Sequence, residues 1–364
     1  MKVIMTGGGT GGHIYPAIAI ADKIKQEQPD AEILFVGTDH GLEKKIVPRH
    51  GYPIEFVTAE GIDRKNLLRN VNVARKLVKG KLEAKKIVER FKPDIVIGTG
   101  GYASAPVIKA GYKFGADVYI HESNAFPGLT NKVSEKYTKK VFLGFADAAK
   151  YFKQPEKHVL TGNPVRKEFF SLNKEDARKD LGISKDRFVV LAFGGSQGAG
   201  RINKAMMDVI EHYNGADGIE ICLGTGSFYY EAILHELESK GIKPADNIRI
   251  KEYINDMDKY LTAADMVISR SGALTVAEVT VCGKPAVFIP SPIVTGNHQF
   301  YNAKAVADKD GAFILEEKML SGEKISEYIN MLRNDRSLLE KMSEASRKCA
   351  LTDATDVIYA NIEG

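Results

Sequence analysis

Short runs of apolar, often β-branched residues alternate along the chain with longer stretches in which apolar residues recur at helical spacing. This alternation is typical of βαβ units built around a parallel sheet. In the first half the apolar runs predict strands at residues 2–5, 31–36, 94–97, 117–120 and 140–143. Helical periodicity between them predicts helices that include residues 17–27 and 71–91.

The pattern restarts in the middle of the chain. The segment RFVVLAFGGSQGAGRIN at 187–203 repeats the order of the amino terminus, which is a strand, a glycine-rich turn and a helix. Further strands are predicted at 219–223, 248–251, 266–268 and 286–289. We therefore expect an α/β fold of two doubly wound, Rossmann-like domains at residues 1–163 and 164–340, facing each other across a cleft. Residues 341–364 are expected to form a helix that packs back across the boundary.

Composition narrows the class of protein. With 44% hydrophobic and 27% charged residues among 364, the chain has the composition of a soluble globular protein. Its apolar runs are too short to cross a bilayer, and its start lacks the apolar core of a signal peptide, so we expect a cytoplasmic protein. Cys222, Cys282 and Cys349 are too widely spaced to indicate a disulfide framework or a zinc site.

The charge is unevenly distributed. Residues 1–163 hold 26 Lys and Arg against 17 Asp and Glu, a net charge of +9, whereas the remaining residues hold 25 against 30, a net charge of −5. The first half is therefore expected to face something anionic.

Two glycine turns follow predicted strands in the first half, MTGGGTGGHIYP at 5–16 and GTGGYASAP at 98–106. Glycines at this position let the backbone approach a phosphate, and the next helix offers its N–H groups. A dehydrogenase fits poorly, because Asp39 lies too far beyond Gly12 for the ribose-binding acid. Two turns at one sheet edge would suit a diphosphate, although glycines also simply permit sharp turns. The predicted diphosphate contacts are Gly8, Gly9, Gly100, Gly101 and Tyr102.

His13 stands where the first turn enters its helix. The positive end of the helix favours the neutral ring, which can accept a proton and serve as a general base. The alternative is a structural hydrogen bond.

The second half offers polar groups suited to a nucleotide sugar. Ser196 lies in the turn GGSQGAG, and SGALT at 271–275 predicts a second helix start at a strand end. Glu278 follows one turn later, where a carboxylate can bind both hydroxyls of a ribose or simply stabilise the first turn of the helix. Asn297, Gln299 and Asn302 are suited to sugar hydroxyls or to a turn.

Seven motifs in this order closely resemble the MurG family: GGTGGHIYPA, GTGGYASAP, HESNAFPGLTNK, TGNPVR, GGSQGA, RSGALTVAE and NHQFYNA. The resemblance implies the GT-B fold and an inverting transfer of N-acetylglucosamine. The donor is UDP-N-acetylglucosamine, and the acceptor is the C4 hydroxyl of the muramoyl sugar in lipid I, which carries an undecaprenyl diphosphate. The product is lipid II of peptidoglycan.

The family's site residues transfer to this sequence motif by motif. In this resemblance Ile254 receives the uracil, Glu278 the ribose, Ser196 the diphosphate and Gln299 the transferred sugar. His13 is the expected base and Glu122 its support. The implied donor-site residues are Thr10, Gly11, Gly12, Asn124, Arg166, Ser196, Ile254, Ala273, Leu274, Thr275, Val276, Ala277, Glu278 and Gln299.

One departure from the family pattern is Ser123-Asn124-Ala125, where many relatives have Gln-Asn-Gly. No DxD-type pair accompanies the cleft motifs, so we expect no cofactor and no protein-bound metal, with helix N-termini stabilising the departing UDP.

A basic segment at 62–92 carries eleven Lys and Arg against three Asp and Glu, interleaved with Leu67, Leu68, Val71, Val73, Leu77 and Val78. An apolar ridge edged by bases favours the surface of an anionic membrane, although a solvated helix would show a similar pattern. No nucleic-acid motif accompanies the charge. The resemblance adds a peripheral place on the cytoplasmic face of the cell membrane, partners in a cell-wall synthesis complex, and roles in cell shape and cell division.

Two other hypotheses stay open at this stage. One is a related GT-B transferase that acts on another lipid acceptor, and the other is a non-catalytic nucleotide-binding membrane adaptor.

Overall fold

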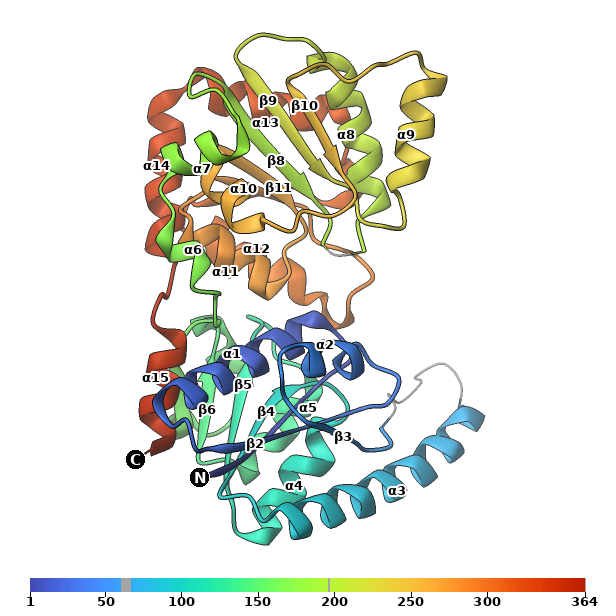
Figure 1. Ribbon diagram of the computed structural model, residues 1–364, viewed down its shortest axis with the longest axis vertical. Helices are drawn as coiled ribbons and strands as arrows, with labels where there is room; N and C mark the ends of the chain where they lie inside the picture. Colours follow the sequence, from blue (N-terminus) through green and yellow to red (C-terminus); the bar gives the residue numbers. More distant parts are fainter. Residues whose placement is uncertain (60–66, 196, 364) are drawn as a thin grey trace. The chain divides into compact units, whose positions relative to one another are not determined.

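The computed structural model describes residues 1–59, 67–195 and 197–363, with the backbone alone described for 67–74 and 295. It divides into two compact units, drawn in Figure 1. Unit 1 comprises residues 1–165 and 351–364, and unit 2 comprises residues 166–350. The division thus falls two residues beyond the predicted boundary at 163.

Unit 1 is built on a seven-stranded sheet in the order β3-β2-β1-β4-β5-β6-β7, in which every neighbouring pair is parallel. Its strands are β1 (Lys2–Gly7), β2 (Glu32–Gly37), β3 (Ile54–Phe56), β4 (Ile95–Gly100), β5 (Asp117–Glu122), β6 (Lys140–Leu143) and β7 (His158–Leu160). The order reverses between β1 and β4, which makes this pair the switch point where doubly wound folds bind ligands.

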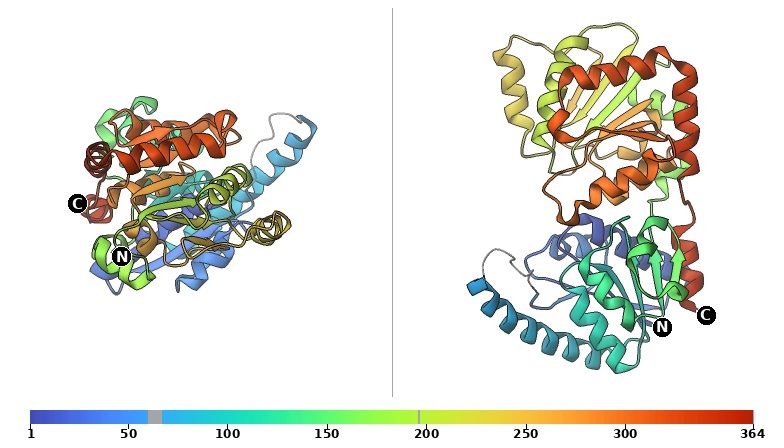
Figure 2. Two further views of the ribbon diagram at one scale, coloured as in Figure 1. Left: turned by 90° about the horizontal axis from the view of Figure 1, so that it is seen from above. Right: turned by 180° about the vertical axis from the view of Figure 1, so that it is seen from behind.

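Helices cover both faces of this sheet. Val3 and Met5 of β1 pack toward α1 and α15, whereas Ile4 between them packs toward α3 and α4. Successive side chains of β1 therefore enter the apolar layers on opposite faces of the sheet. The helices are α1 (Gly11–Glu27), α2 (Glu43–Arg49), α3 (Leu67–Phe91), α4 (Ser104–Phe114), α5 (Leu129–Ser134) and α15 (Ala354–Glu363), with short 3₁₀ turns at Glu135–Tyr137, Ala146–Tyr151 and Pro155–Lys157. The amino-terminal end of α3 reaches beyond the sheet of its unit (Figure 2).

Unit 2 repeats this design with a six-stranded parallel sheet in the order β10-β9-β8-β11-β12-β13. Its strands are β8 (Phe188–Phe193), β9 (Ile219–Gly224), β10 (Ile248–Lys251), β11 (Met266–Ser269), β12 (Ala286–Phe288) and β13 (Ala312–Ile314). The switch point here lies between β8 and β11, where Phe193 is paired with Ser269.

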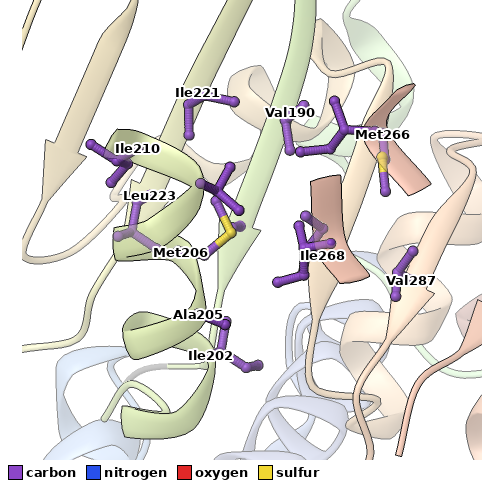
Figure 3. Packing of buried hydrophobic residues seen from close by; sticks show 14 of the residues in the cluster. Val190, Ile202, Ala205, Met206, Ile210, Ile221, Leu223, Met266, Ile268 and Val287 are labelled. Atoms are coloured by element: carbon purple, nitrogen blue, oxygen red, sulfur yellow. The ribbon is translucent and has the colours of Figure 1, made fainter. Parts of the chain in front are cut away.

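The core of unit 2 is fully packed between its sheet and its helices. Figure 3 shows Ile202, Met206 and Ile210 of α8 in one apolar cluster with Val190 and Leu223 of the sheet, and all five side chains are at most 1% exposed. The helices are α6 (Glu168–Ser171), α7 (Lys174–Leu181), α8 (Gly200–Tyr213), α9 (Tyr230–Ser239), α10 (Met257–Ala263), α11 (Ala273–Val281), α12 (His298–Ala307), α13 (Gly322–Asn334) and α14 (Arg336–Lys348), with 3₁₀ turns at Thr295–Asn297 and Glu317–Met319.

The carboxyl terminus corrects one prediction. Residues 341–364 are not a single returning helix: α14 begins earlier, at Arg336, and belongs to unit 2, and α15 alone belongs to unit 1. There α15 lies beside α1 (Figure 1), because Ile358 and Ile362 enter the apolar layer of α1 and Tyr359 accepts a hydrogen bond from Gln28.

Candidate active site

The two glycine turns of unit 1 begin side by side. Gly7 at the end of β1 is paired with Gly100 at the end of β4, so both turns leave the sheet at its switch point. The prediction that they share one edge of the sheet is confirmed. An anionic group placed at this edge would face both turns.

The N–H groups of the first turn divide into two sets. Gly8 donates to the carbonyl of Gly100 at 3.3 Å, and Gly9 donates to the carboxylate of Glu43 at 2.8 Å. By contrast, the N–H groups of Gly11 and Gly12 donate no hydrogen bond to any described residue. The side chain of Thr10 does not cap the helix either. The N–H groups of Gly8 and Gly9 are thus hydrogen-bonded within the protein, and the contact of these two glycines with a diphosphate stays a prediction.

The second turn is pressed against the first. Gly100 and Gly101 have φ of +107° and +86°. A Cβ atom at Gly100 would lie 2.7 Å from ring atoms of His13, and one at Gly101 would lie 2.4 Å from the carbonyl oxygen of Gly8. Both positions thus require glycine for conformation and for space. Tyr102, the next residue, is 63% exposed at the same edge.

The ring of His13 is oriented by a backbone carbonyl. Its Nδ1 lies 2.8 Å from the carbonyl oxygen of Thr99, which can only accept, so Nδ1 carries the proton. In the neutral ring the lone pair is then on Nε2. The Thr99 hydroxyl also donates to the carbonyl of His13 at 2.7 Å, so that one residue holds both the ring and its backbone. This is the tautomer that a general base needs.

Pro16 removes one helical hydrogen bond from the first turn of α1. Proline has no N–H, so the carbonyl of Gly12 four residues earlier loses its helical donor. The Ser123 hydroxyl lies 3.4 Å from that carbonyl and 3.4 Å from Nδ1 of His121. His121 is fully buried, and burial together with the nearby His13 lowers its pKa to about 4. The loop after β5 is thereby connected to the start of α1.

The carboxylate of Glu122 is enclosed by that same loop. It accepts hydrogen bonds from the N–H groups of Asn124 and Gly128 and from the side-chain amides of Asn124 and Asn131, at 2.9 to 3.2 Å. Burial raises the pKa of Glu122, although these four donors oppose the rise. The carboxylate of Glu122 thus accepts from loop groups, whereas Nδ1 of His13 donates to the carbonyl of Thr99. Support of His13 by Glu122 stays a prediction.

In unit 2 the turn after β8 packs against the turn after β9. Gly195 and Gly198 have φ of +91° and +79°, and a Cβ atom at Gly198 would lie 2.0 Å from the carbonyl oxygen of Thr225. Ser196, the predicted diphosphate ligand of this turn, lies outside the described residues. A hollow of about 450 Å³ lies beside the turn and is lined by Gln197, Gly198, Ser227, Phe228 and Tyr229.

The turn after β11 opens α11, whose first residues Ala273, Leu274 and Thr275 were predicted to present their N–H groups. Gly272 at the N-cap has no side chain to cap them, and within the described residues no acceptor lies on these three N–H groups. Val276 and Ala277 complete the first turn behind them. This helix start is available to an anionic group.

Glu278 is the unusual group of this unit. Its side chain is partly buried, and no described residue donates a hydrogen bond to it or forms an ion pair with it. Burial raises its pKa to about 7, and the charge of Arg166 opposes that rise. The structure thus brings two predicted site residues of unit 2, Arg166 and Glu278, near each other. The Arg166 guanidinium also lies 5.0 Å from the centre of the Phe169 ring.

Two further predicted residues take defined places. Ile254 is 5% exposed, and its side chain packs against Gly224 at the end of β9. Gln299 in the first turn of α12 accepts a hydrogen bond from the N–H of Ser291 at 2.8 Å through its side-chain oxygen. That bond directs the oxygen inward and leaves the amide nitrogen as the donor of the side chain.

The described residues offer neither a cluster suited to a metal nor a helix suited to span a membrane. They contain no cluster of three or more His, Cys, Asp or Glu side chains placed to hold a metal ion. None of their helices combines the length and the apolar character needed to cross a membrane.

Sequence reasoning missed Thr99 and Glu43. Thr99 orients His13 through its backbone carbonyl, which leaves no trace in the side-chain sequence. Glu43 had a signal that was not used: it is the first residue of α2 and follows two glycines, Gly37 and Gly41, that make room for it.

Known proteins share this architecture from end to end. Residues 3–143 match the glycosyltransferase family 28 N-terminal domain, and residues 189–358 match the glycosyltransferase family 28 C-terminal domain. The chain is 44% identical over 364 residues to the UDP-N-acetylglucosamine--N-acetylmuramyl-(pentapeptide) pyrophosphoryl-undecaprenol N-acetylglucosamine transferase of Clostridioides difficile, covering all of this chain and 88% of that relative. It is 42% identical over 358 residues to the protein of the same name from Caldicellulosiruptor saccharolyticus, covering 98% and 96% of the two chains.

A solved structure agrees with the sequence matches. The crystal structure of Acinetobacter baumannii MurG superimposes with a TM-score of 0.79 at 28% identity, covering 100% of this chain and 99% of that one. The predicted fold of two Rossmann-like domains is confirmed.

Proposed function

Because the chain belongs to glycosyltransferase family 28, and within it to the MurG family, we propose that it transfers N-acetylglucosamine from UDP-N-acetylglucosamine to lipid I. The product is lipid II, the disaccharide precursor of peptidoglycan. The full-length match to relatives that carry this activity in their names is the observation that carries the proposal.

His13 is the proposed general base. With the proton on Nδ1 held by Thr99, Nε2 accepts the proton of the C4 hydroxyl of the muramoyl sugar. The hydroxyl oxygen then bonds to the anomeric carbon of N-acetylglucosamine as the bond from that carbon to UDP breaks. Attack from the face opposite UDP inverts the centre and gives the β1,4 bond. Glu122 supports this step indirectly, since it shapes the loop whose Ser123 hydroxyl meets the first turn of α1.

The lipid's diphosphate is proposed to lie at the start of α1. Among the described residues, the N–H groups of Gly11 and Gly12 have no acceptor there, and Tyr102 is exposed in the second turn at the same edge. Helix N-termini favour anions through their partial positive charge.

The nucleotide sugar is proposed to occupy the switch point of unit 2. The ribose hydroxyls donate to Glu278, the uracil meets the main chain at Ile254, and the amide nitrogen of Gln299 donates to the transferred sugar. Ser196 and the N–H groups at the start of α11 hold the diphosphate and stabilise the charge that UDP gains as it leaves. The helix start provides this stabilisation without a metal.

Work on a lipid-linked acceptor calls for a membrane surface, and α3 is the proposed contact. Within its described part, Leu77, Val78 and Leu82 are 38%, 58% and 57% exposed, and Lys76, Lys81 and Lys86 are exposed beside them. Such a helix binds an anionic membrane through its apolar side chains and its charges. Residues 62–66 of the predicted segment lie outside the described residues. We place the enzyme peripherally on the cytoplasmic face, in peptidoglycan synthesis.

The decisive experiment offers UDP-N-acetylglucosamine with a panel of acceptors: a lipid I analogue, a diacylglycerol, and a polyprenyl phosphate without the muramoyl sugar. Formation of the disaccharide on the lipid I analogue alone supports the proposal. Transfer to another lipid and not to lipid I would favour a related transferase, and no transfer to any acceptor while UDP still binds would favour a nucleotide-binding adaptor.

A further inference from the structure

Glu43 is a buried carboxylate beneath the first glycine turn, and neither the motifs nor the proposed chemistry uses it. It is fully buried at the start of α2. One oxygen, Oε2, accepts from the N–H of Gly9 at 2.8 Å. The other, Oε1, accepts from the N–H of Thr38 at 2.8 Å and from the Thr38 hydroxyl at 2.7 Å. The carboxylate therefore ties the turn after β1 to the end of β2.

The charge of this group is held in place by donors. Burial acts to raise the pKa of Glu43, but the hydrogen bonds from Gly9 and Thr38 outweigh it, and the net pKa lies below its ordinary value. No described lysine, arginine or histidine forms an ion pair with Glu43. A buried carboxylate with three donors and no cation stays ionised only while those donors keep their positions.

Three glycines from three segments make room for this side chain. A Cβ atom at Gly8 would lie 2.2 Å from Oε1, one at Gly41 would lie 2.1 Å from Oε2, and one at Gly37 would lie 2.5 Å from Cγ. None of the three has a positive φ, so their backbone conformations are open to other residues. Glycine is required at these positions because the Glu43 side chain occupies the space of a Cβ atom, and not because of the backbone conformation.

The bond from Gly9 decides which way the turn faces. Gly9 has φ of +86° and directs its N–H inward to Glu43. The open N–H groups are consequently those of Gly11 and Gly12, directly before His13. We propose that Glu43 is a positioning residue, which fixes the turn so that these N–H groups and His13 meet the acceptor. This inference rests on the proposed function for the identity of the acceptor.

The substitution Glu43→Gln tests this with almost no change of volume. Since Oε1 serves two donors and Oε2 one, the amide oxygen takes the place of Oε1, and the amide nitrogen then faces the N–H of Gly9 donor to donor. Thr38→Val is the matched control, because it removes one donor from Oε1 and leaves the bond to Gly9 intact. Steady-state kinetics with each substrate varied are combined with hydrogen exchange of the peptide 5–16 and thermal unfolding.

For Glu43→Gln we expect the KM for the lipid I analogue to rise about tenfold or more, as befits a lost charge-assisted hydrogen bond. The KM for UDP-N-acetylglucosamine should stay within about twofold, exchange over 5–16 should speed up, and Thr38→Val should show little of either effect. Equal changes in both KM values together with a lower unfolding midpoint would overturn the proposal, because they would reveal a role in stability alone. Unchanged exchange and kinetics would overturn it as well.

A failure of the proposed function can be distinguished from a failure of the inference about Glu43. If the unsubstituted protein transfers nothing to the lipid I analogue, the proposed function fails, and hydrogen exchange still tests the bracing of the turn. Faster exchange in Glu43→Gln than in Thr38→Val would then support the bracing, and equal exchange would overturn it.

Discussion

Replacing Glu278 by glutamine is expected to have two effects: it should stabilise the free protein, and it should weaken nucleotide binding. The carboxylate is partly buried and has no donor among the described residues. An ionised carboxylate in that position lacks solvent and lacks hydrogen bonds, which raises the free energy of the folded state. Ribose hydroxyls would supply the missing donors, so the same charge that costs stability in the free protein would gain binding energy in the complex.

The size of the effect follows from the pKa. Burial raises the pKa of Glu278 from 4.5 to about 7. A carboxylate whose folded pKa lies above its unfolded pKa contributes stability that is complete below about pH 4.5 and is lost as the pH rises through about 7. The difference corresponds to about 3 kcal/mol. Because the side chain keeps some contact with solvent, we expect a realised cost of about 1 to 2 kcal/mol.

Calorimetric unfolding between pH 5 and 8.5 measures the first half of this prediction. The transition of unit 2 is identified as the one that UDP-N-acetylglucosamine shifts upward. Glu278→Gln should be more stable than the unsubstituted protein by about 1 to 2 kcal/mol at pH 8, and the difference should vanish toward pH 5. Glu231→Gln, an exposed glutamate at the start of α9, is the control and should change neither stability nor binding.

Titration calorimetry measures the second half. UDP-N-acetylglucosamine is the suitable ligand, because both of its phosphates are esterified and do not titrate near pH 7. Binding should weaken as the pH falls through about 7, since protonation removes the charged acceptor, and Glu278→Gln should lose this dependence. Glu278→Ala should lose about 1.5 to 3 kcal/mol of binding free energy at pH 8. Equal stability of Glu278→Gln and the unsubstituted protein at pH 8 would refute the burial cost, and unchanged affinity in Glu278→Ala would refute the contact with the ribose.

Three further outcomes are expected. His13→Asn should lower kcat by about 10² to 10⁴ while the affinity for UDP-N-acetylglucosamine stays within about twofold, and an unchanged kcat would remove His13 as the base. EDTA should leave the rate unchanged, as expected if helix N-termini stabilise UDP, whereas a loss that Mg²⁺ restores would contradict this. Val78→Glu should weaken binding to vesicles of anionic lipid about fivefold or more in sedimentation assays, while Met319→Glu, an equally exposed apolar position in unit 2, should not.

The pattern of apolar runs predicted the central strands because these strands are buried on both faces. β6 begins and ends as predicted, and β1, β4 and β5 extend two or three residues further, into the glycine turns and the motif at Glu122. The edge strand β10 was also predicted with its observed bounds, because its four residues form an apolar run that alternates with charged residues. The edge strands β3, β7 and β13 were missed. Each of these strands has only three residues, which is too short for a period of two to be recognised. Each is also partly exposed, so none forms a continuous apolar run.

The helices at the carboxyl terminus show a different limit. Both α14 and α15 carry an apolar stripe, and a stripe predicts that a helix packs without indicating on which sheet. Ile358 and Ile362 find their partners in unit 1, hundreds of residues earlier in the sequence. That choice depends on three-dimensional shape and is absent from local periodicity.

The sequence predicted where the two glycine turns of unit 1 lie, but not which of their N–H groups stay open. Glycine spacing correctly placed both turns of unit 1 at one sheet edge. Which N–H groups remain open depends on acceptors far away in sequence, namely Glu43 for Gly9 and the carbonyl of Gly100 for Gly8. The orientation of His13 likewise depends on a carbonyl, which every residue possesses.

Three glutamates of the sites differ in how many donors reach their carboxylates, and this number separates their roles. Glu43 accepts three hydrogen bonds and Glu122 accepts four, so their oxygens are occupied by the protein itself. Glu278 is partly buried and receives none from the described residues. A buried carboxylate without donors raises the free energy of the folded protein. A ligand whose hydroxyl groups donate to the carboxylate would remove this cost when it binds. Ligand binding should therefore change the hydrogen bonds of Glu278 and leave those of Glu43 and Glu122 as they are.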